Sequence, residues 1–336
     1  MDMRRVLTFV MAGGKGERLW PLTKDRAKPA VPFGGIYRIV DVTLSNCINS
    51  GIRKIHVLVQ YKSHSLQRHL LMGWNIFNSE LGDYIDIIPA QQRTGDYWYR
   101  GTADAIYQNL YAVEQERPDH VLVLAGDHIY KMNYADLLAF HQTHRAAVTV
   151  GVIEMERERA KGFGIVETDA EGRIVGFEEK PAQPKTIPGQ PDRCFVSMGI
   201  YLFERQLLQD SLIGDAQRAE STHDFGRDII PAAARNVKMM AYNFKDENKK
   251  ESKYWRDIGT LDAYFEANMD LCQVNPEFNL YDPEWPLRTY QPQAPPAKFV
   301  FAELGRRCGQ ALDSIISGGC IVSGSTIHGS VLCPNV

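Results

Sequence analysis

Two cationic residues follow a glycine-rich stretch near the N-terminus, and together they could bind a phosphate. The stretch contains Gly13, Gly14 and Gly16, and the cations are Arg18 and Lys28. Glycines let a backbone approach a phosphate closely and turn its N–H groups toward the anion. The Arg18 guanidinium offers a planar pair of donors, and the Lys28 ammonium offers a compact charge. A simple tight turn is the alternative, but two cations with no use in a core favour phosphate binding.

Two aspartates could hold Mg²⁺ beside such a phosphate. Asp127 follows an apolar run that ends in Gly126, and Asp257 lies in a polar loop flanked by bulky residues. Magnesium usually takes one or two carboxylates together with phosphate oxygens and water. The alternatives are a helix N-cap for Asp127 and a turn residue for Asp257. Spacing alone does not decide between these interpretations and the metal site.

Histidines near Asp127 raise the question of zinc. His128 is adjacent to it, and His141 and His144 lie three residues apart on one predicted helix. No third ligand for that pair lies within sequence reach. We therefore interpret His141 and His144 as surface or packing residues.

The elements that must position these residues alternate in type over about the first 240 residues. Runs rich in Val, Ile and Leu predict strands, and amphipathic stretches between them predict helices. This alternation predicts an α/β fold, with a mostly parallel mixed sheet and helices on both faces. Ligands of such sheets bind beyond the carboxyl ends of the strands, where Gly13 and Asp127 fall. The predicted strands are 5–10, 54–59, 120–124 and 147–153, and the predicted helices are 63–72, 102–115 and 134–145.

The pattern changes after about residue 275, where clustered prolines predict an irregular linker. Apolar residues then recur every six positions with glycine and serine between them, which favours the start of a parallel β-helix with these side chains inside, although chance spacing is the alternative. We expect only about one coil, so the β-helix looks truncated. The recurring residues are Ile315, Ile321, Ile327 and Cys333. The predicted domains are a catalytic domain over 1–275, a linker over 276–310 and the beginning of a β-helix over 311–336.

Composition bounds the class of protein. The 336 residues are 44% hydrophobic and 24% charged with a formal net charge of −3, which suits a globular protein with a sizeable core. Neither a nucleic-acid surface nor a membrane span is indicated, since no apolar run approaches the about 20 residues that a span needs. The six cysteines form no C-x-x-C pair. Reduced thiols in a cytoplasmic protein are the expected state.

Longer segments spread along the whole chain carry a more specific signal. They include AGGKGERL (12–19), WYRGTADAIYQN (98–109), LAGDHIYKM (124–132), FEEKPA (177–182) and YWRDIGTLDAY (254–264). In these segments the chain resembles the bacterial glucose-1-phosphate adenylyltransferases, or ADP-glucose pyrophosphorylases. The resemblance implies a Rossmann-like nucleotidyltransferase domain followed by a left-handed β-helix. It also implies transfer of the adenylyl group of ATP to α-D-glucose 1-phosphate, giving ADP-glucose and pyrophosphate for glycogen synthesis.

The resemblance also implies a role for individual residues. Arg18 and Lys28 would orient the triphosphate and, with Asp127, make up the catalytic set, while Asp127 and Asp257 would hold Mg²⁺. Lys180 would bind the phosphate of glucose 1-phosphate. The nucleotide-binding positions are Gly13, Gly14, Gln91 and Gly101. The sugar-phosphate positions are Tyr99, Gly164, Glu179, Lys180 and Ser197.

One position departs from the family pattern. Ile36 stands where relatives often have a lysine that binds anionic regulators, and Arg38 is the nearby cation. Family members are homotetramers and have a longer β-helix that contributes to assembly and to allosteric regulation. Two alternatives stay open at this point. The chain could be a non-catalytic regulatory subunit of the same family, or a sibling enzyme that uses another nucleotide.

Overall fold

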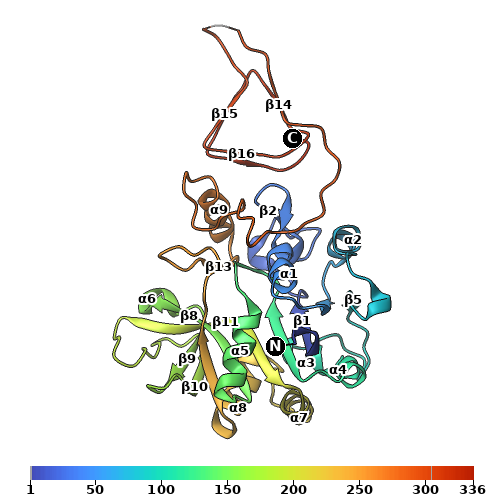
Figure 1. The fold of residues 1–336 in the computed structure, drawn as a ribbon, viewed down its shortest axis with the longest axis vertical. Coiled ribbons are helices and arrows are strands. Elements are labelled where there is room, and N and C mark those ends of the chain that lie inside the picture. The colour runs from blue at the N-terminus through green and yellow to red at the C-terminus, as the bar shows by residue number, and fades with distance from the viewer. Residues whose placement is uncertain (1, 304) are drawn as a thin grey trace.

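A nine-stranded mixed sheet forms the centre of the molecule (Figure 1). This is seen in a computed structural model of the protein, which describes residues 2–303 and 305–336. Four neighbouring strands run parallel in the order β6, β1, β4, β5. They are β1 (Val6–Met11), β4 (Lys54–Val59), β5 (Tyr84–Pro89) and β6 (His120–Ala125). The predicted α/β architecture with a largely parallel sheet is therefore confirmed.

The rest of the sheet is mostly antiparallel and forks at one point. The long strand β11 (Arg193–Glu204) pairs along one edge with β8 (Val148–Glu156), which also pairs with β12 (Met239–Asn243). Along its other edge, β11 pairs first with β9 (Gly164–Thr168) and then with β6. The register shifts between Ser197 and Ile200. The sheet therefore opens between the ends of β9 and β6, with β10 (Ile174–Glu179) beyond β9.

Helices cover both faces of the sheet, as predicted. Within β1, Val6 and Val10 pack on one face, and Leu7 and Phe9 pack on the other, because successive side chains of a strand point to opposite sides. The first face is covered by α1 (Ile39–Asn49), α2 (His64–Gly73) and α5 (Tyr134–His144). The second face is covered by α3 (Thr102–Tyr107), α4 (Leu110–Glu116), α7 (Arg205–Ala216) and α8 (Ile230–Asn236). No helix in the described part of the chain is long and apolar enough to cross a membrane.

The single helix predicted over 102–115 is wrong in one respect, since it is broken into α3 and α4. The backbone N–H of Asn109 bonds to Ile106 O at 2.9 Å, a tighter step than an α-helical bond. The side chain of Asn109 instead takes Ala105 O, at 2.7 Å, and donates to the Tyr99 hydroxyl. A short polar side chain that competes for backbone carbonyls in this way interrupts a helix.

Short parallel strands form the C-terminal part, at the top of Figure 1. They pair as successive coils of a β-helix do, which confirms the predicted type of structure. The predicted inward position of Ile321 is wrong, because its exposed fraction is 62% and that of Val322 is 5%. The side chain at the middle of a three-residue strand points opposite to its two neighbours, and here the middle residue is Val322. The pairs are β14 (Lys298–Val300) with β17 (Ile321–Ser323), β15 (Gln310–Leu312) with β18 (Thr326–His328), and β16 (Ile315–Ile316) with β19 (Val331–Leu332).

His141 is a packing residue, as predicted. It is buried on α5, its Nδ1 lies 2.8 Å from Thr149 Oγ1, and its ring meets that of His120 edge-on at 5.1 Å. Its Nε2 has no hydrogen-bond partner among the described residues. Burial, reinforced by His120, lowers the pKa of His141 to about 4. The folded protein therefore holds this ring neutral.

We expect this buried ring to make the protein less stable in mild acid. In the unfolded chain a histidine takes up its proton near pH 6.5, whereas folded His141 takes it up only near pH 4. Stability is therefore unaffected above pH 6.5 and falls between pH 6.5 and 4, by about 3 kcal/mol at most. Urea unfolding at pH 7.5 and pH 5 should show a smaller loss for His141→Gln than for the wild type. Equal losses in the two proteins would contradict this account.

Candidate active site

Two carboxylates and an ammonium group meet beyond the carboxyl end of β6. Asp127 follows that strand after Gly126, and Asp257 ends β13 (Trp255–Asp257). Strand β13 pairs antiparallel with β7 (His128–Tyr130), which brings the two segments together although they are far apart in sequence. Lys28 Nζ lies 2.7 Å from Asp127 Oδ2 and 3.1 Å from Asp257 Oδ1. The pair proposed as metal ligands is thus assembled around a cation.

The charges in this cluster stabilise one another. Burial on its own would raise the pKa of Asp127, but the positive charge of Lys28 and the hydrogen bond that it donates outweigh burial and lower the pKa. Burial on its own would lower the pKa of Lys28, but Asp127 and Asp257 outweigh it and raise the pKa. Around neutral pH Asp127 is therefore ionised and Lys28 protonated. A divalent cation entering between the carboxylates would have to displace this ammonium.

The glycine-rich loop runs beside the cluster. A methyl group built on Gly14 would meet no atom within 4 Å, so the backbone there is open to a ligand. Arg18 is exposed, and a methyl group on Gly259 would lie 3.3 Å from its Nη2 and 3.1 Å from Asp257 Oδ2. The guanidinium therefore approaches the carboxylate cluster from the solvent side. Arg18 and Lys28, which the sequence predicts as one set, thus lie beside the same loop, with Arg18 exposed and Lys28 buried.

A cavity of about 260 Å³ opens between this loop and α3. It brings together three of the four predicted nucleotide positions, Gly13, Gly14 and Gly101. Gly101 also has a packing reason to be glycine, since a methyl group there would lie 2.2 Å from His223 O. Tyr99, which the resemblance assigns to the sugar phosphate, lines this cavity as well.

Gln91 does not join the other predicted nucleotide positions. It is exposed just beyond the end of β5 and lines neither cavity of the candidate site. Its contact with the adenine therefore stays a prediction.

A second cavity, of about 240 Å³, lies where the sheet forks. Four of the five predicted sugar-phosphate positions line it, namely Gly164, Glu179, Lys180 and Ser197, together with Asp257. Lys180 is exposed and its Nζ lies 3.3 Å from Glu179 Oε1. Its backbone φ of 52° is unusual for a lysine, and it directs the chain into Pro181. The three charged side chains of residues 178–180 therefore do not all face solvent, because Glu179 is turned toward the cavity.

Sequence reasoning missed several residues that line this cavity. Asp224 accepts a bond from Thr102 Oγ1 at 2.9 Å, and Tyr201 OH lies 3.3 Å from Ser197 Oγ. Thr102 and Asp224 line both cavities, so a ligand in one adjoins a ligand in the other. The segment HDFGRDIIP (223–231) carries the same family resemblance as the segments quoted above, and it could have pointed to Asp224. His128 was also passed over as a site residue.

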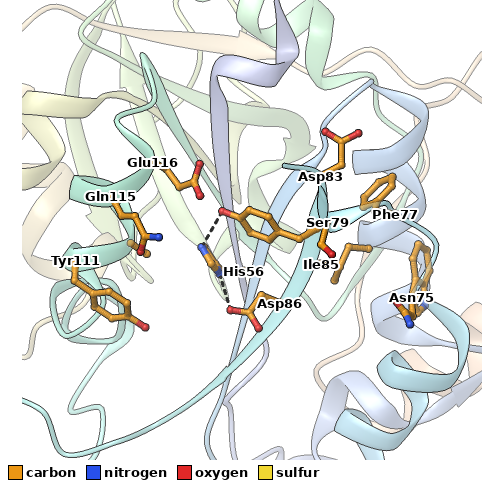
Figure 2. A pocket seen from close by; sticks show the side chains of 13 residues that line it. His56, Asn75, Phe77, Ser79, Asp83, Ile85, Asp86, Tyr111, Gln115 and Glu116 are labelled. Atoms are coloured by element: carbon orange, nitrogen blue, oxygen red, sulfur yellow. Dashed lines mark hydrogen bonds and ion pairs between the residues drawn. The ribbon is translucent and has the colours of Figure 1, made fainter. Parts of the chain in front are cut away.

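A larger cavity, of about 420 Å³, lies away from these residues, between β5, α4 and residues 74–83 (Figure 2). Its walls carry the carboxylates of Asp83, Asp86 and Glu116, and Lys54 is paired with the last of these. His56 Nε2 lies 3.3 Å from the Tyr84 hydroxyl, and its Nδ1 lies 3.4 Å from Asp86 Oδ2, toward which its ring points in Figure 2. A polyanion would be repelled here, so this cavity is a poor candidate for a phosphate site.

Comparison with known proteins gives two family matches along the chain. Residues 7–274 match the family described as nucleotidyl transferase, and residues 295–336 match that described as GlmU-like, C-terminal hexapeptide. The similar proteins include several that are named glucose-1-phosphate adenylyltransferase. That of Rhodopirellula baltica is 53% identical over 98% of this chain and 75% of its own length. Those of Alkalilimnicola ehrlichii and Koribacter versatilis are 54% and 53% identical over 99% of this chain, and 78% and 80% of their lengths.

Proposed function

The chain belongs to the glucose-1-phosphate adenylyltransferase family, and on that premise we propose that it transfers the adenylyl group of ATP to α-D-glucose 1-phosphate. The products are ADP-glucose and pyrophosphate, and the reaction feeds glycogen synthesis. The observation that carries the proposal is the pair of adjoining cavities with the Lys28, Asp127 and Asp257 cluster beside them. Two substrates that must meet at a phosphate need this arrangement.

In the proposed reaction a phosphate oxygen of glucose 1-phosphate attacks the α-phosphorus of ATP, and the bond to the β-phosphate breaks. The nucleophile needs no general base, because a phosphate monoester with a second pKa near about 6 is largely dianionic at neutral pH. The remaining difficulty is repulsion between two polyanions and the charge on the departing pyrophosphate. Arg18 and Lys28 neutralise that charge, and Lys180 holds the sugar phosphate in line.

The donor set at the carboxylate cluster fits a divalent cation, and we propose Mg²⁺. Asp127 and Asp257 already share one positive group, and a nearby triphosphate would complete an oxygen environment. A bound Mg²⁺ would neutralise phosphate charge and orient the reacting phosphate. Lys28, displaced from the carboxylates, would then be free to contact the phosphates. The proposed site of action is the cytoplasm, which suits six cysteines that are all unpaired.

Lys180→Ala should chiefly raise KM for glucose 1-phosphate, by about tenfold to a hundredfold, because it removes a charge-assisted bond to the substrate phosphate. KM for ATP and kcat should change much less. Steady-state kinetics with each substrate varied in turn measures the difference. Lys185→Ala is the matched control, since that lysine lies on the same segment and its Nζ faces Glu167 at 3.8 Å. An unchanged KM for glucose 1-phosphate would show that the sugar-phosphate site is elsewhere.

The sibling alternative is tested by the choice of nucleotide. The chain is supplied with Mg²⁺, glucose 1-phosphate and ATP, UTP, dTTP or CTP in turn, and pyrophosphate release is measured. Release that is at least about a hundredfold faster with ATP supports the proposed base specificity, as expected when a site recognises the polar groups of one base. Faster release with another nucleotide would keep the mechanism and overturn the assignment of adenine.

A further inference from the structure

His128 is held against the two metal-binding carboxylates by the strand pairing. In the β7–β13 ladder Asp257 lies directly opposite His128, so their side chains project to the same side. His128 Nε2 lies 3.5 Å from Asp127 Oδ1 and 3.7 Å from Asp257 Oδ1. One possible ligand atom from each of the three side chains lies within 4.8 Å of the other two. Ligands of one metal ion have such separations.

The other ring nitrogen fixes the orientation of the imidazole. His128 Nδ1 lies 3.1 Å from Met198 O. A carbonyl oxygen only accepts, so Nδ1 carries the hydrogen, and in the neutral ring Nε2 presents a lone pair. The ring also meets Trp255 edge-on at 5.1 Å, which restricts its rotation. Histidines that bind metals usually donate their second N–H to a carbonyl or carboxylate in this way.

His128 Nε2, the nitrogen that faces the carboxylates, makes no hydrogen bond within the described part of the chain. Across residues 2–303 and 305–336 it has no hydrogen-bond partner, because both carboxylate distances exceed a hydrogen bond. Lys28 Nζ bonds to the two carboxylates. This ammonium balances the two carboxylates, and a divalent cation that displaced it would meet two carboxylate oxygens together with the lone pair of the His128 nitrogen.

We propose that His128 is a third protein ligand of the divalent cation, and that it makes the site bind Co²⁺ and Mn²⁺ better than two carboxylates would. The inference rests on the proposed function, which puts a metal at Asp127 and Asp257. Magnesium prefers oxygen donors, whereas imidazole nitrogen favours the transition metals. A site with one nitrogen among its ligands therefore accepts both kinds of ion and distinguishes between them.

Calorimetric titration with Co²⁺ and with Mg²⁺, in the absence of substrates, tests the selectivity. The wild type should bind Co²⁺ more tightly than Mg²⁺. His128→Gln, which offers an amide oxygen, should lose on the order of tenfold in Co²⁺ affinity and less than about threefold in Mg²⁺ affinity. His120→Gln is the matched control, because His120 begins the same strand that Asp127 follows, and it should behave as wild type. Equal losses for both metals, or no loss, would overturn the proposal.

A measurement on the wild-type protein tests the same proposal without a variant. The protein is labelled with ¹⁵N at histidine and loaded with Mn²⁺, and pulsed electron paramagnetic resonance is recorded. Coupling of the bound ion to a histidine nitrogen is expected, and its absence from bound Mn²⁺ would overturn the proposal. Neither experiment involves turnover, so an inactive protein with a nitrogen-ligated metal would refute the proposed reaction and leave this inference standing.

Discussion

Replacing Asp127 with asparagine should lower kcat for pyrophosphate release by about a thousandfold or more. The substitution keeps the shape of the side chain and removes the charge that pairs with Lys28 at 2.7 Å and that would bind the metal. Loss of metal-assisted stabilisation costs several kcal/mol in a transition state, and each 1.36 kcal/mol is about tenfold in rate. Binding of ATP should weaken only modestly, because the glycine loop and Arg18 are unchanged. Single-turnover rates and equilibrium ATP titrations separate the two effects.

Asp86→Asn is the matched control for this substitution. Asp86, in strand β5, also has a histidine beside it, with its Oδ2 3.4 Å from His56 Nδ1, but it lines the larger cavity away from the site. It should leave kcat within about twofold of wild type, as expected for a substitution outside the machinery. A full-rate Asp127→Asn enzyme would remove Asp127 from the mechanism. Equal losses in the two variants would point to a general effect on folding.

Lys28→Met should give the second largest loss, about a hundredfold to a thousandfold in kcat/KM for ATP. The methionine fills the same buried space, so the change is mainly the loss of a preorganised positive charge. The same substitution should have an opposite effect on the metal. Without its ammonium, Asp127 and Asp257 no longer hold an internal cation, and Mg²⁺ should bind the substrate-free protein more tightly than it binds wild type.

The paired readout makes the role of Lys28 specific. Steady-state kinetics measures kcat/KM, and calorimetry with Mg²⁺ alone measures the affinity. Lys24→Met removes a cation from the turn that precedes Lys28 and serves as the control. A variant that loses activity together with Mg²⁺ affinity would mean that Lys28 assembles the carboxylates and does not compete with the metal.

Most of the fold could be predicted because its signals are local. Buried strands such as β6 carry continuous apolar runs, here residues 121–125, and the loop that follows β1 carries its own glycines. Asp127 was identified from its place at the end of one such run. The local pattern also indicated the β-helix, but it did not settle which of Ile321 and Val322 faces inward.

The parts that could not be predicted depend on contacts between distant segments. Asp257 reaches Asp127 only because β13 pairs with β7, and no local pattern gives that register. The fork of the sheet at Ser197 depends on β9 and β6 sharing one edge of β11. The pairing of β13 with β7 also directs His128 toward the carboxylates. A histidine next to an aspartate in sequence carries no such information by itself.

The most direct test of the central claim is product formation by this chain alone. Folded protein is incubated with Mg²⁺, ATP and glucose 1-phosphate, and ADP-glucose and pyrophosphate are quantified together. The account predicts that the two products appear in equal amounts, and that neither appears when glucose 1-phosphate is omitted. Folded protein that binds ATP and glucose 1-phosphate yet forms neither product would contradict the account and identify the chain as a non-catalytic member of its family.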